Sequence, residues 1–360
     1  MNIIEVSVGE LTDFINSAAY NRLDIKPITP QRAVSQSKNP DALKGDLALV
    51  YASENNSLLS FAGLIPARLN HSGIVASSNS GWWVNPDKGK TMGLPVFLRA
   101  FHGCGRKMFL TDCSAYTKEI LEKTGYFEFF PPVIGKRWFL RFYTARILNR
   151  KDCNPLAVNM MKGIDHLANL VKKPWDLTFA YPGDRMDEEI LQTGRLENNV
   201  EAFIDANSGN FFIRQDINRL NWMVGNPWVT TDPCSHAVKY PFTTVVENFL
   251  QYFLVIRKKG VLKAVVLLSV RDNHVSVPFY YGPEEGMAET AMILRSHILS
   301  LHANSLIVYH AALIRAFDRI KLPAYYSTHL VRHAGYSKEL SIRPSGAGLF
   351  QDGEADVVFT

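Results

Sequence analysis

The sequence predicts a mixed α/β protein built from two copies of one α/β fold. Its 360 residues exceed the roughly 250–300 at which a single hydrophobic core stops growing. Segments typical of strands and helices follow one another in the same order in both halves. Matching segments lie a nearly constant distance apart, since 203 residues separate Leu58 from Val261 and 198 separate Lys107 from Ser305. The two halves share negligible sequence identity. The repeat is therefore one of strand and helix order and not of amino-acid sequence.

The first half contains runs of apolar and β-branched residues bounded by turn residues, which are typical of strands. The strands are expected at 46–53, 58–69, 73–84 and 107–112. A helix is expected after Gly93, with Pro95 in its first turn, where proline is tolerated because its missing N–H would have no partner. A second helix begins after Ser114 as its N-cap and ends at Gly125.

The second half repeats this order after a basic, partly amphipathic connector. Strands are expected at 253–260, 261–270, 274–282, 305–310 and 323–331, and helices at 287–302 and 311–317. The repeat divides the chain into an N-terminal domain, a connector and a C-terminal domain. The expected boundaries are 1–145, 146–178 and 179–360.

Composition excludes several classes of protein. Apolar residues make up 47% of the chain and its net charge is +5, which gives no case for nucleic-acid binding. No apolar run reaches the roughly 20 residues of a membrane span, and the N-terminus lacks the regions of a signal peptide. The four cysteines have no C-x-x-C spacing, which argues against a zinc or redox site. We expect a cytoplasmic monomer or homodimer with reduced, buried thiols and no metal.

One loop raises the question of phosphate binding. Residues 84–93 read VNPDKGKTMG and contain the GKT of a nucleotide-binding P-loop. That motif needs a glycine five residues before Gly89 so that the backbone can curl round the phosphates, and Val84 occupies this position, so the P-loop interpretation fails. The loop still leaves an expected strand and opens an expected helix, whose first amides and dipole attract anions. Lys88 and Lys90 add positive charge.

This order of strand, basic loop, helix, strand and helix resembles the GNAT N-acetyltransferase superfamily. The resemblance is carried by GWWVNPDKGKTMGLPVFLRAF (81–101) and FLTDCSAYTKEILEKTGYFEF (109–129), and the C-terminal half matches in element order only. It implies two tandem GNAT-like domains, each a mixed, mostly antiparallel sheet flanked by helices. LNWMVGNPW (220–228) and FQDGEADVVF (350–359) look similar to tandem GNAT proteins encoded with surface-polysaccharide biosynthesis genes.

In this family the loop grips the pyrophosphate of coenzyme A, so the resemblance implies acetyl-CoA or another acyl-CoA as co-substrate. Lys88 stands at the family's arginine position, Thr91 at its middle glycine and Gly93 at its last glycine, with one residue missing before Lys88. The alternative is that NPDKG forms an ordinary surface turn. The residues expected to bind coenzyme A are Trp83, Val84, Lys88, Gly89, Lys90, Thr91, Met92, Gly93 and Ser114.

Acetyl transfer needs a base, an oxyanion donor and an acid. Asp112 is the candidate base, because it ends a strand where the two central strands should separate, although TDCS also fits a helix cap. Tyr116 is the candidate acid, although an aromatic near a helix start is also typical of packing. Leu121 occupies the position of the family's usual tyrosine acid. By analogy with the family, the backbone N–H of Val84 is the oxyanion donor.

The tryptophans have both functional and structural interpretations. Trp82 and Trp83 face opposite sides of their strand, so one is expected in the core and the other beside the pocket. The Trp- and Asn-rich segment 219–228 fits a carbohydrate pocket or buried packing equally well.

The second copy carries acidic residues where the first carries lysines. Glu284 and Glu285 lie in its equivalent loop, Tyr281–Met287, and should repel a pyrophosphate. We therefore expect the second copy to pack structurally or to shape an acceptor pocket at the domain interface, without binding coenzyme A in the usual way.

The leading hypothesis is an acyl-CoA-dependent N-acyltransferase that acts by direct transfer through a ternary complex. Its expected acceptor is an amino group of a small metabolite, and family association suggests an amino sugar or nucleotide sugar. Two alternatives stay open. A FemAB-like aminoacyl transferase would need a strongly basic groove. A non-catalytic acyl-CoA-binding or scaffold protein of the same fold is favoured by Thr91, Leu121 and the acidic second loop.

Overall fold

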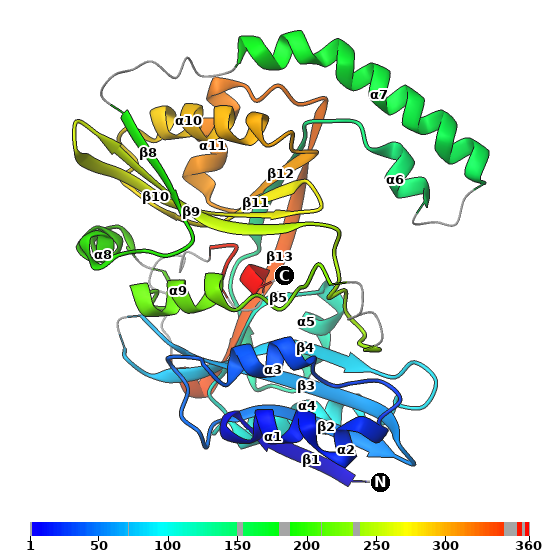
Figure 1. Cartoon of the computed structure of the whole chain (residues 1–360). Helices are drawn as coiled ribbons and strands as arrows, with labels where there is room; N and C mark the ends of the chain where they lie inside the picture. The colour runs from blue at the N-terminus through cyan, green and yellow to red at the C-terminus, as the bar shows by residue number, and fades with distance from the viewer. Residues whose placement is uncertain are drawn as a thin grey trace. The chain divides into compact units, whose positions relative to one another are not determined.

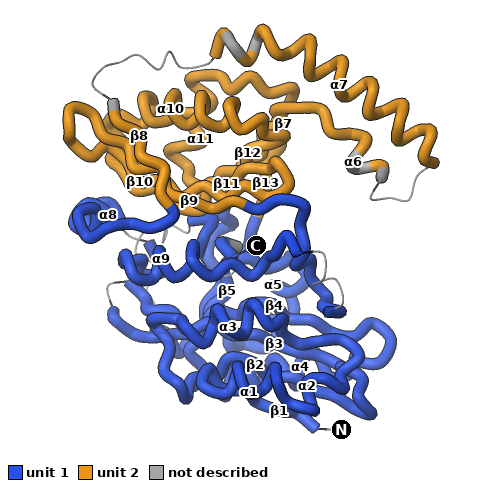
Figure 2. Tube along the Cα trace, in the orientation of Figure 1, with its two compact units in different colours: residues 1–133, 194–249, 332–360 blue, residues 134–193, 250–331 orange. Residues whose placement is uncertain are grey.

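The computed structural model describes residues 2–70, 72–149, 154–179, 188–209, 211–232, 238–341, 351–354 and 357–359. The chain divides into two compact units, which Figure 2 colours separately. Unit 1 comprises 1–133, 194–249 and 332–360, and unit 2 comprises 134–193 and 250–331. Each unit is therefore assembled from segments that are far apart in the sequence.

Unit 1 contains strands in the order β1-β2-β3-β4-β5-β13, with β6 beside β13 (Figure 1). Their bounds are β1 (Asn2–Ser7), β2 (Leu47–Glu54), β3 (Ser57–Arg68), β4 (Val75–Val84), β5 (Met108–Cys113), β6 (Phe127–Phe129) and β13 (Tyr326–Ser337), which begins in unit 2. Neighbouring strands run antiparallel, whereas β4 and β5 run parallel.

Helices cover both faces of the sheet in unit 1. They are α1 (Leu11–Asn16), α2 (Ala18–Arg22), α3 (Pro30–Gln36), α4 (Gly93–Gly103), α5 (Ala115–Lys123), α8 (Glu201–Asn207) and α9 (Ile217–Gly225). Side chains alternate along β2, so that Val50 and Ala52 pack in one hydrophobic cluster with α4, and Leu49 and Tyr51 pack in another with α1. Two cores therefore lie on opposite faces of these strands.

Unit 2 contains strands in the order β7-β12-β11-β10-β9-β8. Their bounds are β7 (Val133–Phe139), β8 (Glu188–Thr193), β9 (Phe249–Lys258), β10 (Val261–Arg271), β11 (His274–Tyr281) and β12 (Ser305–Val308). Its helices are α6 (Thr144–Asn149), α7 (Pro155–Thr178), α10 (Met287–Ser300) and α11 (Ala311–Ile320). Here too one pair, β11 and β12, is parallel. Both units therefore repeat the order strand, helix, parallel strand, helix.

The predicted strands and helices of both halves are present, although β13 begins three residues later than expected and extends to Ser337. Sequence reasoning missed β1 with α1–α3, and also β6–β8, α6, α8 and α9, and it gave α7 only as part of a partly amphipathic connector. The predicted domains are contiguous segments and do not coincide with the compact units, because 194–249 and 332–360 return to unit 1.

The described cysteines are free thiols. Burial raises the pKa of Cys104 to about 11 and that of Cys113 to about 12, and both side chains are half-buried. Cys153 and Cys234 lie outside the described residues. None of the helices in the described ranges is long and apolar enough to cross a membrane.

Candidate functional site

Two parallel strands of unit 1 separate soon after they begin to pair. In the described chain, β4 and β5 are in register at Ser77–Met108 and Ser78–Phe109. Beyond these pairs, β4 continues to Val84 beside β3, whereas β5 continues beside β13. Among the described residues β4 and β5 form no further pair, and an extended ligand can hydrogen-bond to a strand edge that is left unpaired.

The loop after β4 is shaped by the buried side chain of Asn85. Its Oδ1 accepts hydrogen bonds from the amides of Asp87 (3.0 Å) and Lys88 (3.1 Å), and its Nδ2 donates to the carbonyl of Leu58 (3.1 Å). Its own carbonyl accepts from the amide of Gly89 (2.9 Å). NPDKG is therefore a turn organised by asparagine, as one interpretation expected. The turn also leads directly into α4, as the anion-binding interpretation required.

Close packing explains both glycines of this loop. A Cβ at Gly89 would overlap the carbonyl oxygen of Leu59 on β3, and a Cβ at Gly93 would lie 2.7 Å from Cγ2 of Val84. Only glycine lets the loop backbone approach β3 this closely. The packing against β3 therefore explains why residue 89 is a glycine, whether or not the loop binds a phosphate.

Helix α4 begins without a side-chain cap. Its N-cap residue is Met92, whose side chain is buried and whose amide donates to the carbonyl of Gly89 (2.8 Å). The third helical residue, Pro95, has no N–H. The amides of Gly93 and Leu94 therefore open the helix without an intrahelical acceptor, an arrangement that binds anions at helix N-termini.

The two lysines of the loop have different surroundings. Lys88 donates from Nζ to Oγ of Ser57 (3.2 Å), which itself donates to Asp24 (3.0 Å). Lys90 is exposed and makes no hydrogen bond or ion pair within the described chain. Lys90 and Thr91 are therefore exposed next to the start of α4, and Lys90 has no partner among the described residues.

Trp82 and Trp83 lie on opposite faces of β4, as predicted. Trp82 packs on Phe97 of α4 with ring centroids 4.7 Å apart, and its Nε1 donates to the carbonyl of Gly93 (3.1 Å). The ring centroids of Trp83 and Phe61 lie 6.1 Å apart, in the hydrophobic cluster that contains α1. The tryptophan that contacts the start of α4 is therefore Trp82, whereas sequence reasoning assigned the coenzyme A contact to Trp83.

Asp112 lies at the end of β5 in a network of charged groups. Its Oδ2 lies 3.4 Å from Nε of Arg332, which also binds the carboxylate of Asp352. The Asp112 side chain is 43% exposed and that of Asp352 is 2% exposed. Burial raises the pKa of Asp352, although Arg332 opposes this shift. A guanidinium attracts neighbouring carboxylates, so Arg332 holds Asp112 and Asp352 close to each other at the end of β5.

The first turn of α5 contains Ser114 and Tyr116. Oγ of Ser114 accepts from the amide of Thr117 (3.1 Å) and caps the helix, which confirms Ser114 as the predicted N-cap and TDCS as a capping segment. The Tyr116 side chain is 73% exposed, which does not fit the packing interpretation. Leu121 is fully buried in the core beside α4.

Sequence reasoning missed Asn85 and Arg332, and it chose Trp83, whereas the structure places Trp82 against α4. Asn85 had a detectable signal, because asparagine before Pro-Asp initiates turns. Arg332 had none, because it reaches Asp112 from β13, near the other end of the chain. Among the described residues, no group of three or more His, Cys, Asp or Glu side chains could hold a metal ion.

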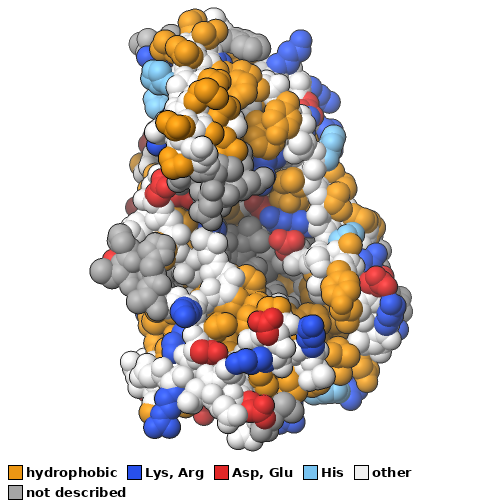
Figure 3. Space-filling view, turned by 90° about the vertical axis from the view of Figure 1, so that its right-hand side faces the viewer, with side chains coloured by type: hydrophobic (Ala, Val, Ile, Leu, Met, Phe, Trp, Pro, Cys, Tyr) orange, Lys and Arg blue, Asp and Glu red, His pale blue; other side chains and the backbone are white. Residues whose placement is uncertain are grey.

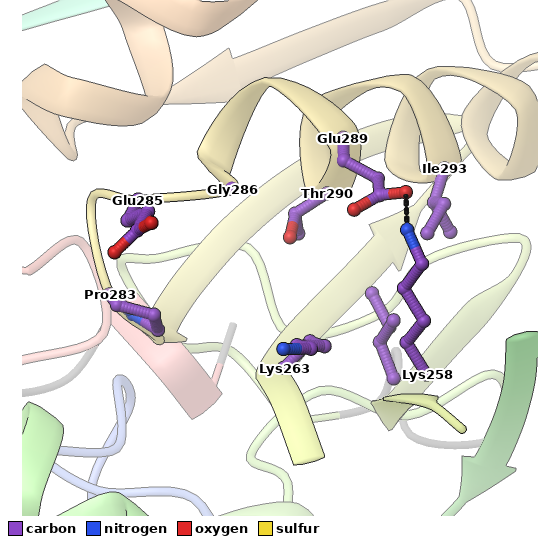
Figure 4. Close-up of a pocket in the computed structure, with 9 residues that line it drawn as sticks. Lys258, Lys263, Pro283, Glu285, Gly286, Glu289, Thr290 and Ile293 are labelled. Carbon is purple, nitrogen blue, oxygen red and sulfur yellow. Dashed lines mark hydrogen bonds and ion pairs between the residues drawn. The ribbon is translucent and has the colours of Figure 1, made fainter. Parts of the chain in front are cut away.

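Unit 2 has a cavity of about 470 Å³ at the loop that corresponds to the basic loop of unit 1 (Figure 4). It is lined by Ile256, Lys258, Lys263, Pro283, Glu285, Gly286, Glu289, Thr290 and Ile293. Lys258 pairs with Glu289 (2.6 Å), and Glu284 pairs with Arg315 (3.5 Å). Arg315 of α11 therefore pairs with the acidic loop, and Lys258 and Lys263 line the same cavity, which the loop sequence alone did not reveal.

The Trp- and Asn-rich segment packs in the core of unit 1. Trp222 and Trp228 donate their indole N–H groups to the carbonyl (2.8 Å) and hydroxyl (3.0 Å) of Ser35. Phe359 stacks on Trp228 with ring centroids 4.4 Å apart. These contacts confirm buried packing as the interpretation of the two tryptophans. Residues 350, 355 and 356 of the similar tail segment lie outside the described residues.

Known proteins resemble this chain in structure and not in sequence. No family model and no curated protein matches the sequence. A conserved protein of Enterococcus faecalis, described as a probable N-acyltransferase, is 11% identical over 94% of this chain and 73% of its own, with a TM-score of 0.53. Saccharomyces cerevisiae N-myristoyltransferase with bound myristoyl-CoA is 9% identical over 99% of this chain and 83% of its own, with a TM-score of 0.51.

A tandem GNAT protein from the clavulanic acid biosynthesis pathway is 8% identical over 93% of this chain and 98% of its own, with a TM-score of 0.47. The predicted fold class is confirmed, since two units with mostly antiparallel strands flanked by helices form a mixed α/β fold that the chain shares with the Enterococcus faecalis protein and N-myristoyltransferase. At this level of identity the likeness concerns the fold alone.

Proposed function

We propose that this protein is an acyl-CoA-dependent N-acyltransferase that acylates an amino group of a small metabolite. The observation that carries the proposal is the separation of β4 and β5 just before the uncapped start of α4. An extended pantetheine arm can pair with an open strand edge, and a pyrophosphate is attracted by a helix N-terminus and by Lys90. The fold shared with a probable N-acyltransferase and with a myristoyl-CoA complex supports this assignment.

In the proposed reaction, the amine nitrogen attacks the thioester carbonyl, a C–N bond forms and the C–S bond breaks. The proton lost by the amine passes to a base, and the leaving thiolate takes up a proton from an acid. Our candidates remain Asp112 as base, Tyr116 as acid and the Val84 amide as oxyanion donor, with Arg332 orienting Asp112. The proposed acceptor is an amino sugar or nucleotide sugar in the cytoplasm, and the proposed state is a monomer or homodimer.

Thermal unfolding with and without acetyl-CoA or myristoyl-CoA tests the binding step. A saturating ligand should raise the melting temperature by about 3–6 °C, because it binds only the folded state. Lys90→Glu should abolish this ligand-induced shift. Lys88→Glu is the matched control and should keep most of it, since Lys88 is directed to Ser57. Absence of a shift with either acyl-CoA, or a full shift in Lys90→Glu, would contradict the proposed site.

A non-catalytic acyl-CoA-binding protein is the second candidate. It is favoured by the exposed Tyr116 and by the ion pair that occupies Asp112. Release of the coenzyme A thiol in the presence of a broad panel of amines separates the two functions. Binding without release under any condition would favour the second candidate, and amine-dependent release that falls at least tenfold in Asp112→Asn would favour the first.

A further inference from the structure

Helix α7 of unit 2 turns its apolar face outward, which reverses the usual pattern of a surface helix. At 100° per residue, six large apolar side chains fall within one stripe roughly 120° wide. The opposite face carries the buried side chains of Asp165, Lys172 and Asp176. The stripe residues, between 47% and 80% exposed, are Leu156, Met160, Ile164, Leu167, Leu170 and Val171.

Polar contacts fix which way α7 faces. Asp165 accepts a hydrogen bond from the amide of Ala145 in α6 (2.8 Å). Lys172 and Asp176 form an ion pair (2.5 Å), and Nη2 of Arg141 lies 3.4 Å from Asp176. If α7 rotated about its axis to bury the stripe, the apolar side chains would face Arg141 and the Ala145 amide. Asp165 and Asp176 would lose these partners, which is unfavourable. The outward stripe is therefore a property of the folded unit.

The stripe forms a continuous apolar surface. Six adjacent side chains exposed to this degree amount to roughly several hundred Å², the size at which an apolar patch marks an interaction site. On the face shown in Figure 3, hydrophobic side chains gather at the top, the end at which α7 is drawn in Figure 1. Single exposed apolar residues elsewhere, such as Leu43, form no such row.

Charge indicates what the stripe contacts. The exposed ionisable side chains of α7 are Lys162, His166 and Lys173, which lie together along one flank of the stripe, whereas both acids of the helix are buried. Aromatic side chains lie beside the helix, since Tyr325 donates to the carbonyl of Ala168 (3.0 Å) and packs on Phe142. An apolar face bordered by basic and aromatic residues is typical of helices that lie in a membrane interface.

We propose that α7 docks on an anionic lipid surface, with the stripe at the acyl-chain boundary and Lys162 and Lys173 at the headgroups. A second copy of the chain fits less well. A two-fold antiparallel pairing would place the same flank of both helices side by side, so the basic residues would meet basic residues.

Co-sedimentation of the full chain with vesicles tests this proposal. At low salt, the protein should bind vesicles of phosphatidylcholine and phosphatidylglycerol (7:3) and should bind pure phosphatidylcholine vesicles about tenfold less. The double variants Leu167→Asp/Val171→Asp and Lys162→Glu/Lys173→Glu should each reduce binding to the anionic vesicles by about tenfold or more. Leu43→Asp changes an equally exposed leucine of unit 1 and should bind as the unchanged protein does.

Far-ultraviolet circular dichroism and melting temperature establish that each variant is folded, which is expected because the altered side chains are exposed. Four results would overturn the proposal. The unchanged protein could fail to bind anionic vesicles, or Leu43→Asp could lose binding as the stripe variant does. Leu167→Asp/Val171→Asp could bind fully, which would indicate adsorption by charge alone. The protein could instead form a dimer in solution that the stripe variant dissociates, which would make a second copy the occupant.

Discussion

Asn85 and Gly89 together build the loop before any ligand arrives. Asn85 ties the turn to β3 through its side-chain amide, and Gly89 lets the turn lie directly against the backbone of β3. A preformed loop does not lose conformational entropy when it binds, and this favours affinity. The sequence pattern drew attention to the lysines, but the shape of the loop depends on these two uncharged residues.

Gly89→Ala should destabilise the protein by about 1–3 kcal/mol, because the added Cβ overlaps the carbonyl of Leu59 and the loop must move. The same movement should remove the melting-temperature shift with acyl-CoA. Urea denaturation measures the first effect. Gly45→Ala is the control, since no atom lies within 4 Å of its added Cβ, and its stability should change by about 0.5 kcal/mol or less. Wild-type stability in Gly89→Ala would contradict this account of the loop.

At the scale of elements, the helices that begin with a side-chain cap differ in position from those that begin without one. Ser114 caps α5, and Nδ1 of His310 accepts from the amide of Leu313 (3.3 Å) to cap α11. The helices that follow β4 and β11, which are α4 and α10, have no side-chain cap. Both units therefore present an uncapped helix start at the same point of the repeated fold.

The cap of α11 should make unit 2 sensitive to acid. Burial lowers the pKa of His310 to about 4, and only neutral imidazole can accept the hydrogen bond of the cap. Since the folded pKa lies below the unfolded value of about 6.5, this stability is fully present above pH 6.5. It is lost progressively as the pH falls toward 4, by at most about 3 kcal/mol.

His310→Asn keeps a capping acceptor without a titrating group. The difference in unfolding free energy between the unchanged protein and His310→Asn should therefore shift in favour of the variant between pH 6.5 and 4. Urea denaturation at several pH values measures it. A difference that is constant over this range would show that His310 does not titrate on unfolding.

The elements of the repeated order were predictable, whereas the short helices were not, and the 24-residue α7 was expected only as a partly amphipathic connector. The strands and helices of the repeated order are marked by apolar runs and by turn residues such as Gly125. Helices of five to seven residues, such as α1–α3 and α8, are too short to be stable alone. They form because they pack on the sheet, and local sequence carries little sign of that.

At the scale of the whole molecule, the chain returns to unit 1 twice. Residues 194–249 supply α8 and α9, and residues 332–360 supply the end of β13 and the tail that covers Trp222 and Trp228. Arg332, which contacts Asp112, belongs to the second of these segments. The candidate site in unit 1 therefore depends on residues 194–249 and 332–360, which the predicted boundaries assigned to the C-terminal domain.

Phe359→Ala should destabilise unit 1 by about 3–5 kcal/mol, because the ring is fully buried against two tryptophans. Tryptophan fluorescence should shift to the red and the urea midpoint should fall. Leu43→Ala, which changes a side chain that is 74% exposed, should leave both unchanged. If Phe359→Ala unfolds at the wild-type midpoint, the tail does not stabilise unit 1.

The sequence by itself determined the mixed α/β class, the repeated order of elements and the position of the basic loop between strand and helix. These properties follow from local patterns of apolar residues, turns and caps, which act over a few residues. The tertiary structure decided that β4 and β5 separate, that Lys88 donates to Ser57, that Arg332 pairs with Asp112 and that α7 faces outward. Each of these features depends on contacts between residues that are distant in sequence. A pattern that extends over a few residues does not predict the energies of such contacts.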